Sequence, residues 1–300
     1  MAEGIDQQRL LLVHAHPDDE TIGTGATIAH YVAAGAQVTV LTCTLGEWGE
    51  ILVPELAELE ATRGDQLGGY RMGEMAAAMT ALGVVDHRYL GAPGRYRDSG
   101  MIGTSANSDP RAFWRGATDS EVFDAAVDDL LTVIRDVRPQ VVVTYNPGGG
   151  YGHPDHMMAH RVSTEAVRRA ADPGHRPDLG AEWTVSKFYW TARPTSVLAG
   201  QLDELRAMPG PYDVPVDAAE LPSDEDALVT SRVDASEQTS AKVAAMRCHA
   251  TQLLVAEDRF ALSNRVAQQL TGVEYYRLVT GPGGPRDAAG FEFDLFGGLQ

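Results

Sequence analysis

Short apolar runs alternate with longer amphipathic stretches along the first part of the chain, which predicts strands and helices in turn. The apolar run 9–14 and the β-branched run 37–43 are expected to be buried strands. Residues 25–34 between them are expected to form a helix that ends at Gly35. Strand, helix and strand in this order form a right-handed parallel unit. The pattern therefore favours an α/β fold with a Rossmann-like, mostly parallel sheet flanked by helices.

The alternation continues to about residue 171. Along this stretch we expect a helix over 56–82 with possible breaks at Gly68, Gly69 and Gly73. We also expect a short strand over 87–90, a helix over 119–137, a strand over 140–145 and a helix over 155–171. Residues 91–110 are rich in Gly, Ser, Pro and Asn, which is typical of a long functional loop.

A change in composition to Pro, Gly and Asp over 172–182 indicates a boundary. We expect a Rossmann-like catalytic domain over 1–182 and a smaller C-terminal lobe over 183–300 that completes the cleft. Within the lobe we expect strands over 185–191 and 274–279, helices over 236–251 and 264–270, a loop over 209–231 and a Gly-rich tail over 281–300.

Charge and cysteine content narrow the class of protein. The formal net charge of −18 over 300 residues disfavours nucleic acid and anionic membranes as partners. Cys43 and Cys248 are too few for a disulfide framework or a thiolate zinc cluster, so we expect two reduced thiols. Residues 1–8 lack the apolar core of a signal peptide, and no stretch is apolar enough to span a bilayer. We therefore expect a cytoplasmic protein.

Two similar tetrapeptides follow two of the predicted strands. HPDD occupies 16–19 after the first strand, and HPDH occupies 153–156 shortly after the strand 140–145. Because open α/β sheets bind ligands at the carboxyl ends of their strands, we expect the two tetrapeptides to face one crevice. Imidazole and carboxylate groups together suit a divalent metal ion, above all zinc.

Three of these side chains are candidate metal ligands. His16 and Asp19 are three residues apart across a turn, so both can point the same way, and His156 is available from the second tetrapeptide. Three protein ligands with one open position are typical of catalytic zinc, although iron(II) also binds two histidines and an aspartate. For HPDD alone, a helix cap at Asp19 and a packed His16 explain the sequence equally well, but the second tetrapeptide favours metal binding.

Four neighbouring side chains are candidates for catalysis. Asp18 is either a solvated turn residue or a general base toward water activated by the metal. His153 is a fourth ligand, a general acid or a stabiliser of negative charge, and we favour the last two because a fourth ligand would close the site. Asp155 either orients a histidine or complements a helix dipole. Tyr151, in a Gly-rich loop, is either a surface residue or a donor to an oxyanion.

A dinucleotide-binding loop is a weaker interpretation of the first unit. Gly23 and Gly25 follow a strand, but Ile28 stands where such a loop needs its third glycine. The carboxylates of 16–19 would also repel a pyrophosphate. We therefore disfavour nucleotide binding.

Longer segments around the tetrapeptides resemble the PIG-L/LmbE-like zinc-dependent N-deacetylases. The resemblance is carried by HPDD with the following GATIA, by VVVTYN with HPDH, and by the segments 41–50, 65–74, 89–101, 148–156, 187–191 and 241–252. It extends over most of the chain but is less specific in the C-terminal lobe. It is strongest toward members that remove acetate from 1-O-(2-acetamido-2-deoxy-α-D-glucopyranosyl)-1D-myo-inositol in mycothiol biosynthesis.

The resemblance implies roles for ten side chains. It implies one zinc ion per subunit, bound by His16, Asp19 and His156. It implies four catalytic groups, namely the base Asp18, the acid or electrostatic stabiliser His153, Tyr151 near the oxyanion and Asp155 behind His153. It also implies three contacts to the hydroxyls of a small amino-sugar-inositol substrate, from Arg71, Asp98 and Glu50, although Arg71 and Asp98 could instead form an ion pair with each other.

Three other functions compete with deacetylation. A mycothiol S-conjugate amidase belongs to the same family, but we expect a lysine shortly after HPDDE in that enzyme, and residues 21–24 contain none. A non-catalytic, metal-stabilised carbohydrate-binding protein would have a closed coordination shell and no need for the spare Asp18. A metallophosphatase would usually need a second metal ion and more carboxylates. The sequence therefore favours deacetylation.

Overall fold

A seven-stranded sheet forms the centre of the computed structural model, which describes residues 7–208, 210–215, 217, 219 and 221–299. Its strands are β1 (Arg9–His14), β2 (Gln37–Thr42), β3 (Asp86–Tyr89), β4 (Val141–Thr144), β5 (Lys187–Ala192), β6 (Ser231–Asp234) and β10 (Val273–Thr280). Their order is β3-β2-β1-β4-β5-β10-β6. The strands from β3 to β5 pair in parallel, whereas β10 is antiparallel to β5 and β6. The expected α/β class with a mostly parallel sheet is confirmed.

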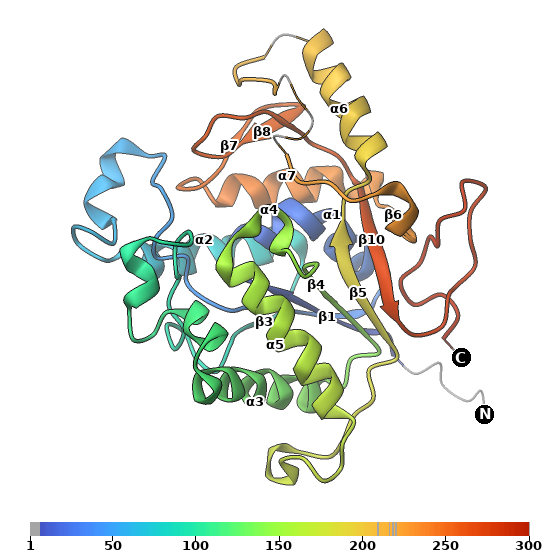
Figure 1. The fold of residues 1–300 in the computed structure, drawn as a ribbon. Coiled ribbons are helices and arrows are strands. Elements are labelled where there is room, and N and C mark those ends of the chain that lie inside the picture. Colours follow the sequence, from blue (N-terminus) through green and yellow to red (C-terminus); the bar gives the residue numbers. More distant parts are fainter. Residues whose placement is uncertain (1–6, 209, 216, 218, 220, 300) are drawn as a thin grey trace.

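Helices cover both faces of this sheet (Figure 1). One face carries α1 (Asp19–Ala33), α2 (Leu67–Leu82) and α7 (Thr239–Cys248), and the other carries α3 (Ser120–Val137) and α5 (Pro154–Ala170). Two further helices are α4 (Gly149–Gly152) and α6 (Thr195–Ala207). Short 3₁₀ segments are η1 (Pro54–Leu59), η2 (Ser105–Ser108), η3 (Phe113–Ala117), η4 (Pro177–Leu179), η6 (Asp226–Leu228) and η7 (Ser236–Gln238). Within the described residues, each helix is too short or too polar to cross a bilayer.

Strand β1 is buried on both faces, which explains its unbroken apolar sequence. Leu11 and Val13 pack toward α3 and α5, while Leu10 and Leu12 pack toward α1, α2 and α7. All four side chains are fully buried. A strand covered on both faces leaves only its ends free to reach a ligand, so polar groups with a chemical role belong at its carboxyl end.

The chain after residue 182 extends the same sheet, because β5, β10 and β6 follow β4 without a gap. Beyond this edge lie α6 and a second sheet of β7 (Leu254–Val255), β8 (Arg259–Ala261) and β9 (Gln268–Gln269), which form a smaller lobe (Figure 1). The tail returns to the body of the molecule, where Leu295 and Phe296 are buried and Lys187 pairs with Glu292. The division into domains at residue 182 stays a prediction.

The structure differs from the expected elements in the C-terminal part. Helix α6 was not expected from the sequence, and residues 264–270 contain the short strand β9 instead of a helix. Pairing of β9 with β8 supplies backbone hydrogen bonds that a local helical pattern does not reveal. Strand β6 likewise begins at the end of the expected loop 209–231, where it pairs with β10.

The expected helix over 56–82 is interrupted, but not at Gly68, Gly69 or Gly73. It divides into η1 and α2, and α2 runs through Gly68, Gly69 and Gly73. A Cβ atom on Gly68 would lie 2.7 Å from Cγ of Glu47 and 2.9 Å from Cβ of Leu45. Gly68 therefore allows close approach of α2 to the loop after β2 and does not break the helix.

Candidate metal centre

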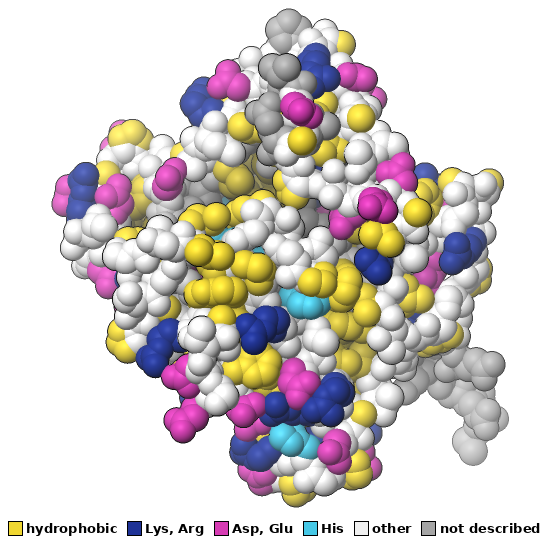
Figure 2. All heavy atoms as spheres, viewed as in Figure 1, with side chains coloured by type: hydrophobic (Ala, Val, Ile, Leu, Met, Phe, Trp, Pro, Cys, Tyr) yellow, Lys and Arg dark blue, Asp and Glu magenta, His cyan; other side chains and the backbone are white. Residues whose placement is uncertain are grey.

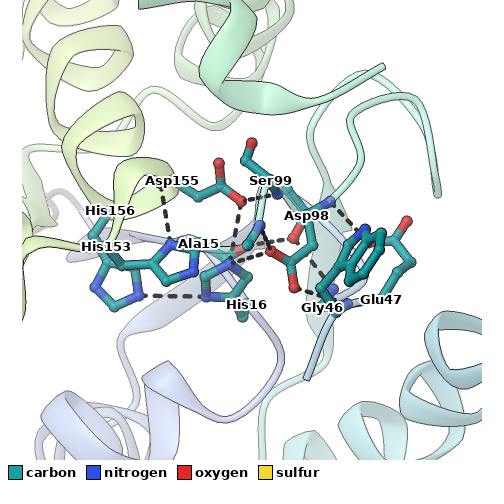
Figure 3. Close-up of polar contacts among 12 residues, drawn as sticks. Ala15, His16, Gly46, Glu47, Asp98, Ser99, His153, Asp155 and His156 are labelled. Atoms are coloured by element: carbon teal, nitrogen blue, oxygen red, sulfur yellow. Dashed lines mark hydrogen bonds and ion pairs between the residues drawn. The ribbon is translucent and has the colours of Figure 1, made fainter. Parts of the chain in front are cut away.

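The two tetrapeptides meet at the carboxyl edge of the sheet (Figure 3). HPDD connects β1 to α1, and HPDH begins α5 after β4. Strands β1 and β4 are parallel neighbours, with Leu10 opposite Val141. The two strand ends therefore lie side by side, and their histidines project into the same space.

Three ligand atoms form a triangle with equal sides. Nδ1 of His16, Nε2 of His156 and Oδ2 of Asp19 lie 3.3 Å from one another. Atoms bound at ~2.0–2.1 Å in tetrahedral directions are roughly 3.3–3.4 Å apart, so the triangle matches one face of a zinc coordination sphere. Two imidazole nitrogens and one carboxylate oxygen also have the right chemistry for a divalent ion. These three residues therefore fit a metal ion.

His153 lies beside this triangle. The ring nitrogens of His16, His153 and His156 lie within 4.8 Å of one another. Nδ1 of His153 accepts a hydrogen bond of 3.2 Å from the backbone N–H of Asp155, so the neutral ring carries its proton on Nε2. Burial and the nearby His16 and His156 lower the pKa of His153 to about 3. The ring is therefore a neutral donor next to the cluster.

The second ring nitrogen of His16 faces two buried carboxylates. Nε2 of His16 lies 3.3 Å from Oδ2 of Asp155 and 3.7 Å from Oδ1 of Asp98. Burial lowers the pKa of His16, but the charge of Asp98 and the hydrogen bond to Asp155 outweigh burial and raise this pKa well above its usual value. A carboxylate behind a metal-binding histidine fixes its tautomer and orientation. The Asp155 carboxylate thus faces His16, whereas the resemblance implies a position behind His153.

Asp18 has an unusual backbone and well-defined partners. Its φ of 120° is positive, which costs energy for a non-glycine residue and is typical of functional sites. The guanidinium of Arg71 donates to Oδ2 of Asp18 over 2.8 Å and also contacts the carbonyl of Pro17. Burial raises the pKa of the Asp18 carboxyl to about 6, against the opposing charge of Arg71. A carboxylate that titrates near neutral pH suits a general base.

The buried ion pair of Glu20 and His249 contacts the backbone of Asp18. The carboxylate of Glu20 accepts the backbone N–H of Asp18 over 3.0 Å and lies 2.9 Å from Nε2 of His249. Both Glu20 and His249 are fully buried. The sequence analysis gave neither residue a role. The available signals were the glutamate directly after HPDD and the histidine within the family-like segment 241–252.

The three residues expected to contact substrate differ in burial and in their partners. Arg71 is almost fully buried and pairs with Asp18, not with Asp98. Asp98 is buried and accepts backbone N–H groups of Trp48 and Gly100. Glu50 is exposed, so its contact to substrate stays a prediction.

The loop after β2 instead brings a different acid to Asp98. The carboxylate of Glu47 is buried and accepts the backbone N–H of Asp98 over 3.0 Å. Burial raises the pKa of Glu47. Sequence reasoning missed Glu47, because Glu47 and Glu50 occupy the same loop and only the fold decides which one faces inward.

Tyr151 lies at the mouth of the cluster. Its side chain is 55% exposed, and its ring lies 5.0 Å from the ring of His156. Gly149, Gly150 and Gly152 around it all have positive φ. This backbone is available only to glycine at low cost, so the loop depends on its glycines. The tyrosine is thus placed over the triangle but not enclosed.

A cavity of about 180 Å³ adjoins the other side of this loop. Asn146 and Gly150 line it from the loop, and Arg193 lines it from the end of β5. Its far wall includes the buried ion pair of Lys242 and Glu274. Figure 2 shows the surface hollowed between the lobe that contains α6 and the body of the molecule. The cavity and the cluster therefore lie on either side of the loop that carries Tyr151.

The fold is found in enzymes of more than one reaction type. The N,N'-diacetylchitobiose deacetylase from Pyrococcus horikoshii has 20% identity and a TM-score of 0.55, with 82% of this chain and 71% of that chain covered. The hydratase GalB from Pseudomonas putida has 18% identity and a TM-score of 0.57, with 94% of this chain and 100% of that chain covered. At these identities the similarity establishes only the class, a Rossmann-like α/β fold used by deacetylases among others.

The family follows from sequence comparison. The family model described as PIG-L: GlcNAc-PI de-N-acetylase matches residues 11–167, and the chain belongs to this family. A relative from Geodermatophilus obscurus, the 1D-myo-inositol 2-acetamido-2-deoxy-alpha-D-glucopyranoside deacetylase, is 58% identical, with 97% of this chain and 98% of that protein covered. The protein of the same name from Streptomyces scabiei is 52% identical, with 97% and 90% covered. The expected family is confirmed.

Proposed function

We propose that this protein hydrolyses the acetamide of 1-O-(2-acetamido-2-deoxy-α-D-glucopyranosyl)-1D-myo-inositol and releases acetate and glucosaminyl-inositol, a step of mycothiol biosynthesis. The relatives at 58% and 52% identity are named for this substrate. The structural observation that carries the proposal is the triangle of ligand atoms beside the buried carboxylate of Asp18. The free thiols Cys43 and Cys248 agree with a reducing, cytoplasmic location.

We assign the metal to His16, Asp19 and His156, with one zinc ion per subunit and iron(II) as the alternative. A divalent ion held there would polarise the acetamide carbonyl and lower the pKa of a water molecule. Asp155 and Asp98 hold the far nitrogen of His16, so the near nitrogen keeps its lone pair for the ion.

Asp18 is the general base of the proposed mechanism. Arg71 fixes one carboxylate oxygen and Glu20 fixes the backbone N–H, so the carboxylate has one defined orientation. It accepts a proton from the attacking water as the carbon–oxygen bond forms. With a pKa near neutrality it is ionised in a large fraction of molecules at pH 7 and can pass the proton on afterwards.

His153 and Tyr151 act on the other side of the reacting carbon. The Nε2–H of neutral His153 donates to the negative charge that develops on the acetamide oxygen, and the departing amine takes up the proton that Asp18 accepted from the attacking water. The exposed Tyr151 adds its hydroxyl to the same oxygen when substrate fills the cleft. Removal of one such donor typically costs ~10²–10³ in kcat.

The sugar and inositol hydroxyls would be bound at the rim. We propose that Asp98 and Glu50 accept hydrogen bonds from the polyol, and that Arg71 contributes both by direct contact and through Asp18. An uncharged polyol with many hydroxyls suits such a rim because each carboxylate oxygen accepts more than one hydrogen bond.

The decisive experiment measures acetate release from N-acetylglucosaminyl-inositol by the purified protein, beside cleavage of a mycothiol S-conjugate. Deacetylation is expected to be faster, to stop after chelation and to return with added zinc. Faster cleavage of the conjugate would identify an amidase instead. Binding of the sugar without acetate release from the zinc-loaded protein would identify a non-catalytic binding protein.

A further inference from the structure

Tyr145 lies next to the candidate metal centre. It follows β4 and is 7% exposed. Its hydroxyl donates to Oδ2 of Asp19 over 2.8 Å and accepts the backbone N–H of Ala15 over 2.8 Å. One oxygen atom therefore connects a proposed ligand to the backbone directly before His16, a second proposed ligand.

The ring and backbone of Tyr145 reach the third ligand. The phenol ring stacks on the imidazole of His156, with centroids 4.2 Å apart and planes inclined by 24°. Its carbonyl oxygen lies 2.9 Å from Nδ1 of His160, one turn further along α5. Tyr145 thus contacts Asp19 and His156 directly and fixes the chain at His16.

The hydrogen bonds of Tyr145 leave its hydroxyl little freedom. The phenol has one proton, and the N–H of Ala15 occupies its acceptor side. Rotation of the hydroxyl away from Asp19 would remove a donor from a carboxylate oxygen that belongs to the triangle. Three electron-rich atoms at 3.3 Å repel one another, so their side chains need such fixed partners.

We propose that Tyr145 is a positioning residue that sets the affinity and coordination geometry of the metal centre. This inference rests on the proposed ligands His16, Asp19 and His156, but not on the identity of the substrate. Partners in the second sphere of a metal site typically contribute 10–100-fold to metal affinity.

The test is the variant Tyr145→Phe, which keeps the ring and removes only the hydroxyl. We expect its zinc affinity, measured by competition with a chromophoric chelator, to be about 10–100-fold weaker than that of the wild type. Tyr189→Phe is the matched control, because Tyr189 is fully buried and its hydroxyl donates to the carbonyl of Leu295 over 3.2 Å. The control is expected to bind zinc with unchanged affinity.

A second readout separates positioning from general packing. The visible absorption of the Co²⁺-loaded protein reports coordination geometry, and it is expected to change in Tyr145→Phe but not in Tyr189→Phe. Tyr145→Met provides a second variant without the hydroxyl, and its flexible side chain adapts to the same space. Wild-type zinc affinity in either folded Tyr145 variant would overturn the inference.

The variant His156→Ala distinguishes this inference from the proposed function. Full zinc content in His156→Ala would overturn the assigned metal site itself. Loss of zinc in His156→Ala together with normal affinity in Tyr145→Phe would overturn only the role of Tyr145.

Discussion

Arg71 and Asp18 form a buried ion pair of 2.8 Å in which the arginine also contacts the carbonyl of Pro17. The arginine therefore holds both the side chain of the proposed base and the backbone just before it. This support maintains Asp18 at a φ of 120°, a conformation that an aspartate rarely adopts.

Replacing the proposed base should strongly lower turnover without removing the metal. Asp18→Ala is expected to keep its zinc, because the triangle of His16, Asp19 and His156 is complete without Asp18. Turnover is expected to fall by about 10²–10⁴-fold, the usual contribution of a general base. Zinc content by elemental analysis and acetate release check this, and near-normal turnover would exclude Asp18 as the base.

The pH dependence of activity should respond to Arg71. The positive charge of Arg71 lowers the pKa of the Asp18 carboxyl, while burial raises it to about 6. In Arg71→Met the carboxyl would be protonated over a wider range, so the acidic limb of the kcat/KM profile is expected to move to higher pH. The loss of activity should be larger at pH 6 than at pH 8. Arg71→Lys keeps the charge and serves as the comparison, and an acidic limb that stays in place in Arg71→Met would contradict the assignment.

The second tetrapeptide should be essential for metal binding. His156→Ala removes one corner of the triangle, and its zinc content after dialysis is expected to be well below one ion per chain. His30→Ala is a suitable control, since His30 lies in the last turn of α1 and outside the cluster. Equal zinc content in the two variants would show that His156 is not a ligand.

The Glu20–His249 pair should stabilise the fold in a defined pH window. Burial lowers the pKa of His249, but Glu20 outweighs burial and raises this pKa overall. The stability gained through His249 is therefore present below pH ~6.5 and is lost as pH rises through the raised pKa. Burial raises the pKa of the Glu20 carboxyl, but the charge of His249 outweighs burial and lowers this pKa overall. The stability gained through Glu20 is therefore lost only as pH falls below ~4.3.

It follows that His249→Gln should destabilise the protein most between pH ~4.3 and ~6.5. Breaking a buried pair in this way is expected to cost about 3 kcal/mol in the free energy of unfolding. Urea unfolding at several pH values provides the measurement. A stability difference that does not vary with pH would argue against an ionised pair.

Two adjacent glycines in α2 should respond in opposite ways to alanine. Gly68→Ala places a Cβ atom against Glu47 and Leu45 and is expected to destabilise the protein by roughly 1–3 kcal/mol. Gly69 has no atom within 4 Å of a new Cβ, so Gly69→Ala is expected to stabilise the helix by about 0.5–1 kcal/mol. Thermal unfolding of the two variants tests this, and equal shifts would contradict the close packing at Gly68.

The parts of the fold that were predictable are those with strong local signals. The apolar runs that became β1 and β4 predict strands on their own, and the polar tetrapeptides after them predict a shared site. Strand β9 depends on its pairing with β8, and the division between η1 and α2 depends on a turn between them, neither of which apolar periodicity reveals. For the same reason, the sequence does not show whether Glu47 or Glu50 faces inward, because only the folded loop decides how each side chain is directed.

The candidate site shows the same distinction. The histidines and aspartates of the two tetrapeptides could be selected from residue type and spacing alone. Tyr145 and His249 could not, because a tyrosine after a strand or a histidine after a helix is usually a packing residue. Their contacts to Asp19 and Glu20 arise from pairs separated by 126 and 229 residues, respectively.

The position of His249 has a consequence for the synthesis of the chain. In the order of synthesis, His249 emerges more than two hundred residues after its partner Glu20 and the neighbouring Asp18. A chain that stops after α5 would contain all proposed metal ligands but would lack His249 and the helix α7 that packs on α1. The support of the proposed base is therefore completed only by the C-terminal part of the chain, whereas the proposed ligands all lie before residue 157.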